Sequence, residues 1–157
     1  MQIAKHRKAK KVQEALGPNF TVLEFDQPTA SASQAATAIG CAVAQIAKSL
    51  VFADAKGAPV LVIASGASRV DEAKVGEILG TSIHRADAAF VKSATGFSIG
   101  GVPPIGHPTR LITLLDQTLK DFDEIWAAGG KPTSVFCLTP GQLNELTGGA
   151  FADVALT

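Results

Sequence analysis

The residue best placed to do chemistry is a single lysine in an apolar segment. Residues 46–53 are predicted to form a strand, and Lys48 interrupts its apolar side chains, beside Ile46, Leu50 and Phe52. Such a lysine either lies at a strand end with its ammonium in water, or points into a cleft. The sequence leaves both interpretations open.

A second candidate is the loop 96–107, which is too rich in Gly and Pro to form a helix or a regular strand. Gly100 and Gly101 allow a ligand to approach the main chain, while Pro103 and Pro104 stiffen the second half of the loop. A stiff turn with free N–H groups can hold a carbonyl or phosphate oxygen. The alternative is a rigid connection between strands. His107 comes directly after these prolines and Gly106, and either faces the ligand or orders the turn through a hydrogen bond.

Other catalytic patterns are missing from the sequence. It has no Ser-His-Asp arrangement, Walker lysine or dinucleotide glycine motif, and His6, His84 and His107 lack metal-ligand spacing. Cys41 and Cys137 are far apart, so two buried, reduced thiols are expected. We expect neither metal nor cofactor. A lysine and a loop of backbone donors suit an anionic ligand whose reactive group is already activated.

Smaller features could complete a pocket or contact an anion. Thr29 and Ser31 lie in a polar loop, 27–33, and act either as turn and N-cap residues or as a pocket wall. A second Gly-rich turn contains Gly129 and Gly130. The predicted helix 3–16 has a basic face that includes Lys5, Lys8 and Lys11, which is either simply solvated or a phosphate-contacting patch.

The surrounding pattern predicts one mixed α/β domain spanning residues 1–157. Helices are expected at 3–16, 33–39, 71–79, 87–92 and from 139 to Gly148, and strands at 20–25, 46–53, 59–64, 110–115, 124–128, 134–138 and 151–156. The net charge of zero argues against a broad nucleic-acid surface and against DNA as a partner. No apolar run could span a membrane and no secretory signal is visible, so a cytoplasmic location is expected.

Four stretches in order resemble the YbaK-type family of aminoacyl-tRNA editing proteins, which includes the editing insertion of bacterial prolyl-tRNA synthetases. They are the strand around Lys48 and Ser49, residues 65–71, the loop from Gly96 through Gly106 and the turn 129–131. The resemblance implies a barrel-like mixed β-sheet surrounded by helices and, without a metal, hydrolysis of the ester joining a wrong amino acid to the tRNA 3′ end. It implies a free-standing trans-editing deacylase, with tRNA-Pro carrying Ala or Cys as the expected substrate.

The resemblance also implies roles for residues. Lys48 would anchor the terminal phosphate or ribose, and N–H groups near Gly100 and Gly101 would hold the carbonyl oxygen as charge develops on it. The substrate-binding set is Thr29, Ser31, Ser49, Val102, Pro103, Pro104, His107, Gly129 and Gly130, and the tRNA-binding set is Lys5, Lys8 and Lys11. A prolyl-tRNA synthetase or an elongation factor is an expected further partner.

Two departures from the family pattern concern the amino acid that is cleared. Ala128 and Val135 replace a serine and an aspartate of the cysteine-clearing branch, and Ser49 follows Lys48 where the alanine-clearing branch tends to have asparagine. The sequence leaves open the amino acid, the tRNA and the nucleophile, which is water, a ribose hydroxyl or the substrate's side chain. The alternative function is a non-catalytic module that binds a tRNA end or a nucleotide beside a synthetase.

Overall fold

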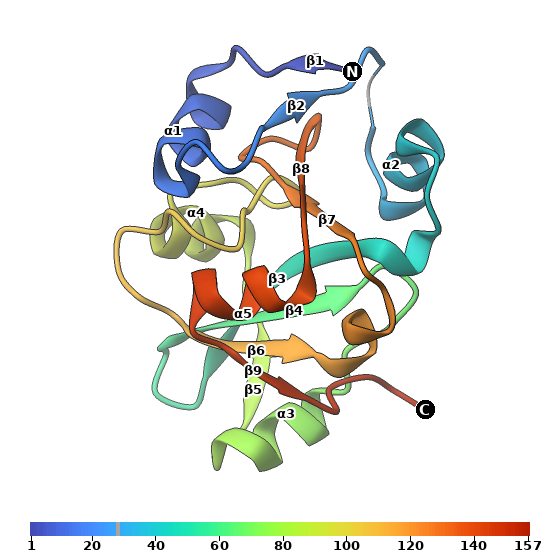
Figure 1. Ribbon diagram of the computed structural model, residues 1–157. Helices are drawn as coiled ribbons and strands as arrows, with labels where there is room; N and C mark the ends of the chain where they lie inside the picture. The colour runs from blue at the N-terminus through green and yellow to red at the C-terminus, as the bar shows by residue number, and fades with distance from the viewer. Residues whose placement is uncertain (28) are drawn as a thin grey trace.

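The computed structural model describes residues 1–27 and 29–157, which form a nine-stranded mixed sheet with helices around it (Figure 1). The α-helices are α1 (Arg7–Leu16), α2 (Ala32–Ile39), α3 (Glu72–Leu79), α4 (Ala88–Thr95) and α5 (Pro140–Thr147). The strands are β1 (Gln2–Ile3), β2 (Leu23–Glu24), β3 (Ile46–Asp54), β4 (Pro59–Ser65), β5 (Ile83–Arg85), β6 (Ile112–Asp116), β7 (Ile125–Ala128), β8 (Ser134–Leu138) and β9 (Ala150–Ala152). The expected mixed α/β class is confirmed.

The sheet runs in the order β1-β2-β8-β7-β3-β4-β6-β9, and β5 pairs with β3 outside this path. The pairs β3–β7, β4–β6 and β6–β9 are parallel, whereas β3–β4 and β7–β8 are antiparallel. Among the described residues the end strands β1 and β9 are not paired with each other. The hydrogen-bonded sheet formed by these residues is therefore open and does not close into a barrel.

Strand β3 is the centre of this arrangement. On one edge, residues 47–53 of β3 pair with β4. On the opposite edge, β3 pairs with β7 only at residues 46–47 and with β5 only at residues 52–54. Residues 48–51 thus have no strand partner on that edge among the described residues. Two cavities open at this gap in the sheet.

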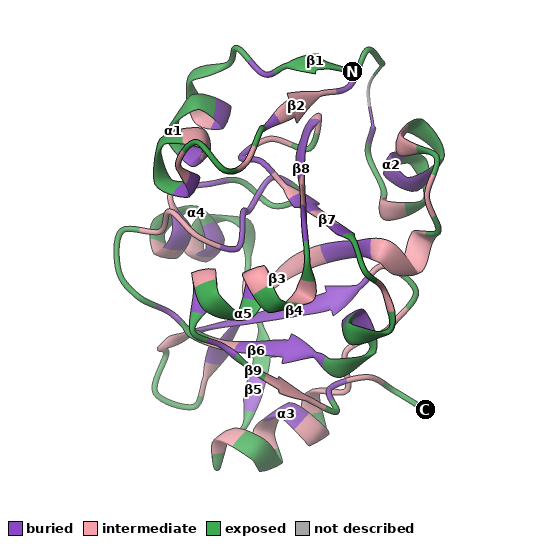
Figure 2. Ribbon diagram, viewed as in Figure 1, coloured by how far each residue is buried: buried purple, intermediate pink, exposed green. Residues whose placement is uncertain are grey.

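Apolar clusters lie on both faces of the sheet, because side chains of a strand alternate between its faces. The larger one packs α1 and α5 against β3 and β4, with Val12, Leu61 and Leu143 fully buried. A second cluster packs α3 through Val75 against Phe52 and Val62, and a third surrounds α2. Figure 2 shows the central strand β4 as almost continuously buried, and β6 as buried over its second half.

The loop that follows α4 is anchored in the larger cluster. Phe97 is completely buried and Val102 nearly so, although the residues between them are mostly exposed. Burying two apolar side chains fixes both ends of the segment. The intervening turn is therefore held in place by the core rather than hanging free.

Several predicted boundaries need correction. The first helix begins at Arg7 with His6 as N-cap, while residues 2–3 pair with β2. The strand expected at 20–25 is only β2, β5 was not predicted, and the last strand is 150–152 rather than 151–156. Such short strands owe their pairing to neighbours distant in sequence, which local propensity does not report. Of the loop predicted at 27–33, Pro28 lies outside the described residues.

Two further observations bear on the sequence predictions. Both cysteines are free thiols but partly exposed, so the expectation that they are buried was wrong. No helix within the described residues is long and apolar enough to cross a membrane.

Candidate active site

A cavity of about 580 Å³ lies at the gap in the sheet, between β3, the start of α2, the β7–β8 pair and the loop after α4. It brings together six residues of the predicted site: Thr29, Ser31, Lys48, Ser49, Gly100 and Val102. The rest of its wall is mainly small or apolar and includes Ala32, Ala35, Ile99, Trp126, Ala128, Pro132 and Val135. Its lining contains no carboxylate or imidazole from the described residues.

Lys48 lines both cavities at the gap, so of the two interpretations of this lysine the structure favours the one in which it points into a cleft. Its Nζ donates a 2.9 Å hydrogen bond to the carbonyl oxygen of Ser68, leaving two N–H groups for a ligand. Burial lowers the pKa of Lys48, the charge of Asp116 opposes that shift, and the charge of Arg69 adds to it.

Asp116 is a site residue that the sequence reasoning missed. It is fully buried at the end of β6, where Oδ2 accepts from the N–H of Ser65 and Oδ1 accepts from the N–H and hydroxyl of Thr118. Ser65 begins the loop whose Ser68 carbonyl holds Lys48. Asp116 is thus connected to the lysine both through this loop and through its charge. The sequence feature that could have indicated Asp116 is its position as an acidic residue at the end of an apolar strand.

Ser49 has an unusual environment in the cavity wall. Its Oγ is buried and makes no hydrogen bond, the one such side-chain atom among the residues that the structure describes. A buried polar group without a partner costs about 1–3 kcal/mol, so native structures rarely keep one without a reason. Ser49 also lines the cavity, which makes its hydroxyl a candidate ligand contact.

The Gly-rich loop contains a tight turn from Ser98 to Gly101. The N–H of Gly101 donates to the carbonyl oxygen of Ser98 at 3.0 Å, and Gly100 has φ +90°. This positive φ in the third turn position is typical of a type II turn and favours glycine. The expected donor of Gly101 is therefore engaged within the loop. The N–H groups of Gly100 and Val102 have no intramolecular partner among the described residues.

The turn at Gly129 and Gly130 supports this loop. A Cβ at Gly101 would lie 2.8 Å from Cα of Lys131 and 2.9 Å from the carbonyl oxygen of Gly130, so the two segments touch through their backbones. Thr29 adds a third segment, because its hydroxyl donates to the carbonyl oxygen of Pro132 at 2.8 Å. Gly129 and Gly130 themselves are not part of the cavity wall.

His107 and Pro104 line a separate cavity of about 260 Å³ on the other side of the loop. A hydrogen bond of 2.8 Å joins the Nε2 of His107 to the carbonyl oxygen of Pro103. Burial lowers the pKa of His107, which favours the neutral ring. This geometry favours an ordering role within the loop, the second of the two roles considered for this histidine.

The lysines of α1 contact the same loop. Nζ of Lys8 donates to the carbonyl oxygen of Gly96 at 2.7 Å, and the ammonium groups of Lys8 and Lys11 lie 5.3 and 5.4 Å from the centre of the Phe97 ring. Lys5 is exposed. Two of the three predicted tRNA-binding lysines thus already have intramolecular partners, and a tRNA contact for any of them stays a prediction.

No group of three or more His, Cys, Asp or Glu side chains that could hold a metal ion occurs in residues 1–27 and 29–157. The cavity instead offers an ammonium, hydroxyls and backbone N–H groups. This donor set suits a phosphate, a ribose or an ester carbonyl.

Comparison with known proteins identifies the family. Residues 26–146 match the aminoacyl-tRNA editing domain, and the chain belongs to that family. A crystal structure described as a candidate trans-editing enzyme for prolyl-tRNA synthetase superimposes with a TM-score of 0.93 and 40% identity, over 98% of this chain and 100% of the other. The expected resemblance is confirmed.

Curated relatives agree with this assignment. An uncharacterised Bacillus subtilis protein, YwhH, is 34% identical over 126 residues, 80% of each chain. An Enterococcus faecalis protein named as a candidate Cys-tRNA(Pro)/Cys-tRNA(Cys) deacylase, EbsC, is 28% identical over 128 residues, 79% of this chain and 76% of its own. A proline–tRNA ligase of Lactobacillus helveticus is 32% identical over 88 residues, 55% of this chain and 15% of the ligase. The family supports hydrolysis of aminoacyl-tRNA esters as the class of activity.

Proposed function

We propose that the protein is a free-standing, trans-acting deacylase that hydrolyses the ester of a mischarged tRNA, with tRNA-Pro carrying Ala or Cys as the substrate. The observation that carries this proposal is the cavity whose wall includes Lys48, Ser49 and the Gly100 turn. The names of the E. faecalis relative and of the trans-editing structure support the tRNA-Pro assignment.

Lys48 anchors the phosphate or ribose of the terminal adenosine. Its ammonium is held by Ser68 and keeps two free N–H groups, so it can act as a fixed positive charge at the cavity mouth. A ligand phosphate also offsets the unfavourable charge of Arg69 nearby. This contact positions the ester without taking part in bond making.

The turn stabilises the transition state. When a nucleophile adds to the ester carbonyl, negative charge develops on its oxygen, and preorganised N–H donors lower the barrier. The N–H groups of Gly100 and Val102 carry this role, because that of Gly101 is bonded to Ser98. The loop needs little rearrangement, since Phe97 and Val102 fix it in the core.

The Ser49 hydroxyl, which has no hydrogen-bond partner among the described residues, forms a hydrogen bond with the substrate. Its buried Oγ lies in the cavity wall next to Lys48, within the set of residues that would surround the aminoacyl ester. The hydroxyl can donate or accept, so it suits the substrate amino group, the ester oxygen or a ribose hydroxyl.

The reaction consumes one water molecule: its oxygen bonds to the carbonyl carbon, the bond to the ribose oxygen breaks, and that oxygen takes up a proton. Since the described lining residues include no carboxylate or imidazole, a lining side chain does not act as general base. An aminoacyl ester is already activated, so positioning and charge stabilisation suffice. A ribose hydroxyl or substrate thiol can assist.

The cavity wall favours a small side chain. Ala32, Ala35 and Ala128 leave room beside Trp126 and Val135, and the pocket offers no charged group at the position of Val135. An apolar pocket distinguishes substrates that differ by one methylene by only about 1–3 kcal/mol. Alanine and cysteine esters are therefore both expected to be hydrolysed.

The test is a panel of tRNAs charged with Ala, Cys, Ser, Thr, Pro and a small non-protein amino acid, incubated with the protein while ester loss is followed. We expect rapid loss of Ala or Cys from tRNA-Pro and no loss of Pro. Binding of these tRNAs without turnover on any of them would replace the proposal with the non-catalytic binding module. A pull-down against prolyl-tRNA synthetase tests that partner separately.

A further inference from the structure

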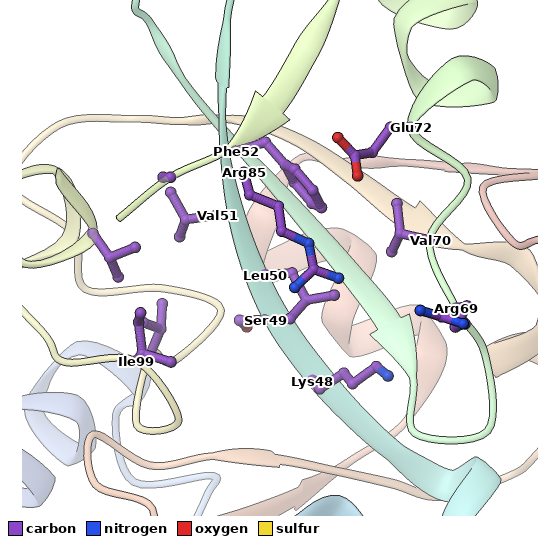
Figure 3. Close-up of a pocket in the computed structure, with 13 residues that line it drawn as sticks. Lys48, Ser49, Leu50, Val51, Phe52, Arg69, Val70, Glu72, Arg85 and Ile99 are labelled. Atoms are coloured by element: carbon purple, nitrogen blue, oxygen red, sulfur yellow. The ribbon is translucent and has the colours of Figure 1, made fainter. Parts of the chain in front are cut away.

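A second cavity, of about 250 Å³, opens at the same gap in the sheet (Figure 3). It shares five residues with the first cavity: Lys48, Ser49, Leu50, Ile99 and Val102. The shared residues make the two cavities direct neighbours, within reach of one extended ligand. The volume is below the range of about 300–1,000 Å³ for complete small-molecule ligands, so it suits a segment of a larger ligand.

The polar lining of this cavity is mainly cationic. Lys48, Arg69 and Arg85 contribute positive charges and Glu72 the only negative one among the described lining residues. Neither arginine forms an ion pair or a side-chain hydrogen bond with the residues that the structure describes. The protein has a net charge of zero, so this excess of positive charge is local.

Strand pairing places Arg85 and Lys48 on the same face. Arg85 of β5 pairs with Phe52, and alternation along β3 puts Lys48, Leu50 and Phe52 on one face. Lys48 and Phe52 are four residues apart, about 13 Å along the strand, which leaves room for two separate ligand groups, one near each position. Figure 3 shows the Arg85 guanidinium directed along the cleft toward Lys48 and Arg69, away from Glu72.

Arg69 reaches the cleft from the loop that also holds Lys48, and its charge opposes protonation of the lysine. Lys48, Arg69 and Arg85 outnumber the negative charges of Glu72 and Asp116 near them, and a bound anion reduces the repulsion among them. Guanidinium groups are well suited to phosphate, because they can donate two parallel hydrogen bonds. The apolar part of the wall, with exposed Ile99 at its border, can cover a sugar or a base.

We propose that Arg69 and Arg85 form a second phosphate subsite, which binds the phosphate on the 5′ side of the penultimate nucleotide of the tRNA. This inference rests on the proposed function, in which Lys48 and the first cavity hold the terminal aminoacyl-adenosine. The single-stranded 3′ end then runs from one cavity into the other past Ile99 and Val102. It lets a chain without net positive charge bind the tRNA end through a local site.

The test uses unacylated dinucleotides that differ in one phosphate, pCpA and CpA, with affinities measured by calorimetry. We expect the wild-type protein to bind pCpA about tenfold more tightly than CpA, because a charge-assisted contact is lost with the 5′ phosphate. Arg69→Gln and Arg85→Gln should each reduce that preference to within about twofold while leaving CpA affinity unchanged. Lys56→Gln, which removes an exposed charge in the β3–β4 turn, should keep the preference.

Two results would overturn the subsite: equal wild-type affinities for pCpA and CpA, or arginine variants that weaken both dinucleotides alike. Inorganic phosphate serves as a further probe, and competition by it at the same concentration as pCpA would indicate a site for free phosphate instead. Because both arginines are exposed, circular dichroism should show an unchanged fold. Deacylation of charged tRNA is measured on the same samples, so loss of the proposed function, with no turnover, is distinguished from loss of the subsite.

Discussion

The Nζ of Lys48 donates a hydrogen bond of 2.9 Å to the carbonyl oxygen of Ser68, which joins β3 to the loop after β4. The buried Asp116 fixes the start of that loop through Ser65. The Lys48 side chain is thus held by a loop whose start is fixed from β6. Such support leaves little conformational entropy to be lost when the lysine binds a phosphate.

Replacing Ser49 by alanine should separate function from stability. The change removes a buried hydroxyl that has no partner, so the free energy of unfolding should stay equal or rise by up to about 1 kcal/mol. Deacylation kcat/KM should fall about tenfold, since a hydrogen bond to the substrate is lost. Denaturant titration and single-turnover kinetics measure the two effects.

The comparison for this variant is Thr95→Val, which removes a buried hydroxyl that makes three hydrogen bonds. Thr95→Val should lower the free energy of unfolding, because three hydrogen bonds are lost. Equal losses of stability in Ser49→Ala and Thr95→Val would show that Ser49 is an ordinary structural serine.

Gly100→Ala should reduce activity more than its effect on stability explains. Alanine at φ +90° costs about 1–2 kcal/mol, and the relief of this strain displaces the N–H groups proposed to bind the carbonyl oxygen. Gly57→Ala is a matched control, because Gly57 has φ +82° in the distant β3–β4 turn. Both variants should lose similar stability, but only Gly100→Ala should lose kcat. Similar kcat values in the two variants would exclude the turn from catalysis.

Asp116→Asn should weaken the support of Lys48. It removes a buried negative charge and one acceptor, so we expect a loss of about 1–3 kcal/mol in stability and a further lowering of the pKa of Lys48. Asp121→Asn, at an exposed position, is the control. The titration of the Lys48 side-chain resonances by NMR measures the pKa, and an unchanged value would contradict the proposed coupling.

The pH dependence of binding follows from the lowered pKa of Lys48. The protonated lysine binds phosphate, so affinity for a CCA trinucleotide should be constant at neutral pH. It should fall as pH rises through the pKa of Lys48, below the ordinary value of 10.5. Unacylated RNA avoids the alkaline lability of the ester. Lys48→Arg, whose charge persists at high pH, should remove this decline; an unchanged decline would assign it to another group.

The lysines in and just before α1 should differ in effect. Lys8→Met removes the hydrogen bond to Gly96 and a charge over Phe97, so it should lower stability and kcat. Lys5→Gln and Lys10→Gln, at exposed positions, should raise KM for whole tRNA but leave the affinity for a CCA trinucleotide unchanged. An unchanged KM for whole tRNA in both exposed variants would exclude a tRNA contact at Lys5 and Lys10.

The sequence predicted the parts of this site that local rules govern. The strand β3, the Gly100 turn and the N-cap function of Ser31, whose Oγ accepts from the N–H of Gln34, follow from residue types and spacing. The mixed α/β class followed from the order of these elements. Lys48 could be recognised as a candidate site residue because a charged side chain is unusual in an apolar strand.

Long-range geometry could not be read in this way. The cavities exist because β7 and β5 stop short of each other along β3, which depends on strand register. Asp116 and Arg85 join the site through this register, although the chain places them 68 and 37 residues from Lys48. The hydrogen bond that occupies the Gly101 N–H depends on how the loop closes.

The most direct test of the central claim is single-turnover deacylation of Ala-tRNA-Pro and Cys-tRNA-Pro by the wild-type protein and by Lys48→Met, which keeps the aliphatic stem but not the charge. We expect the wild-type protein to remove at least one of the two amino acids far faster than spontaneous hydrolysis, and to leave Pro-tRNA-Pro intact. The lysine variant, folded as judged by circular dichroism, should lose at least about tenfold in rate when its charge-assisted contact is removed. Equal rates for the two proteins, or no turnover by the wild-type protein, would contradict the role assigned to this cavity.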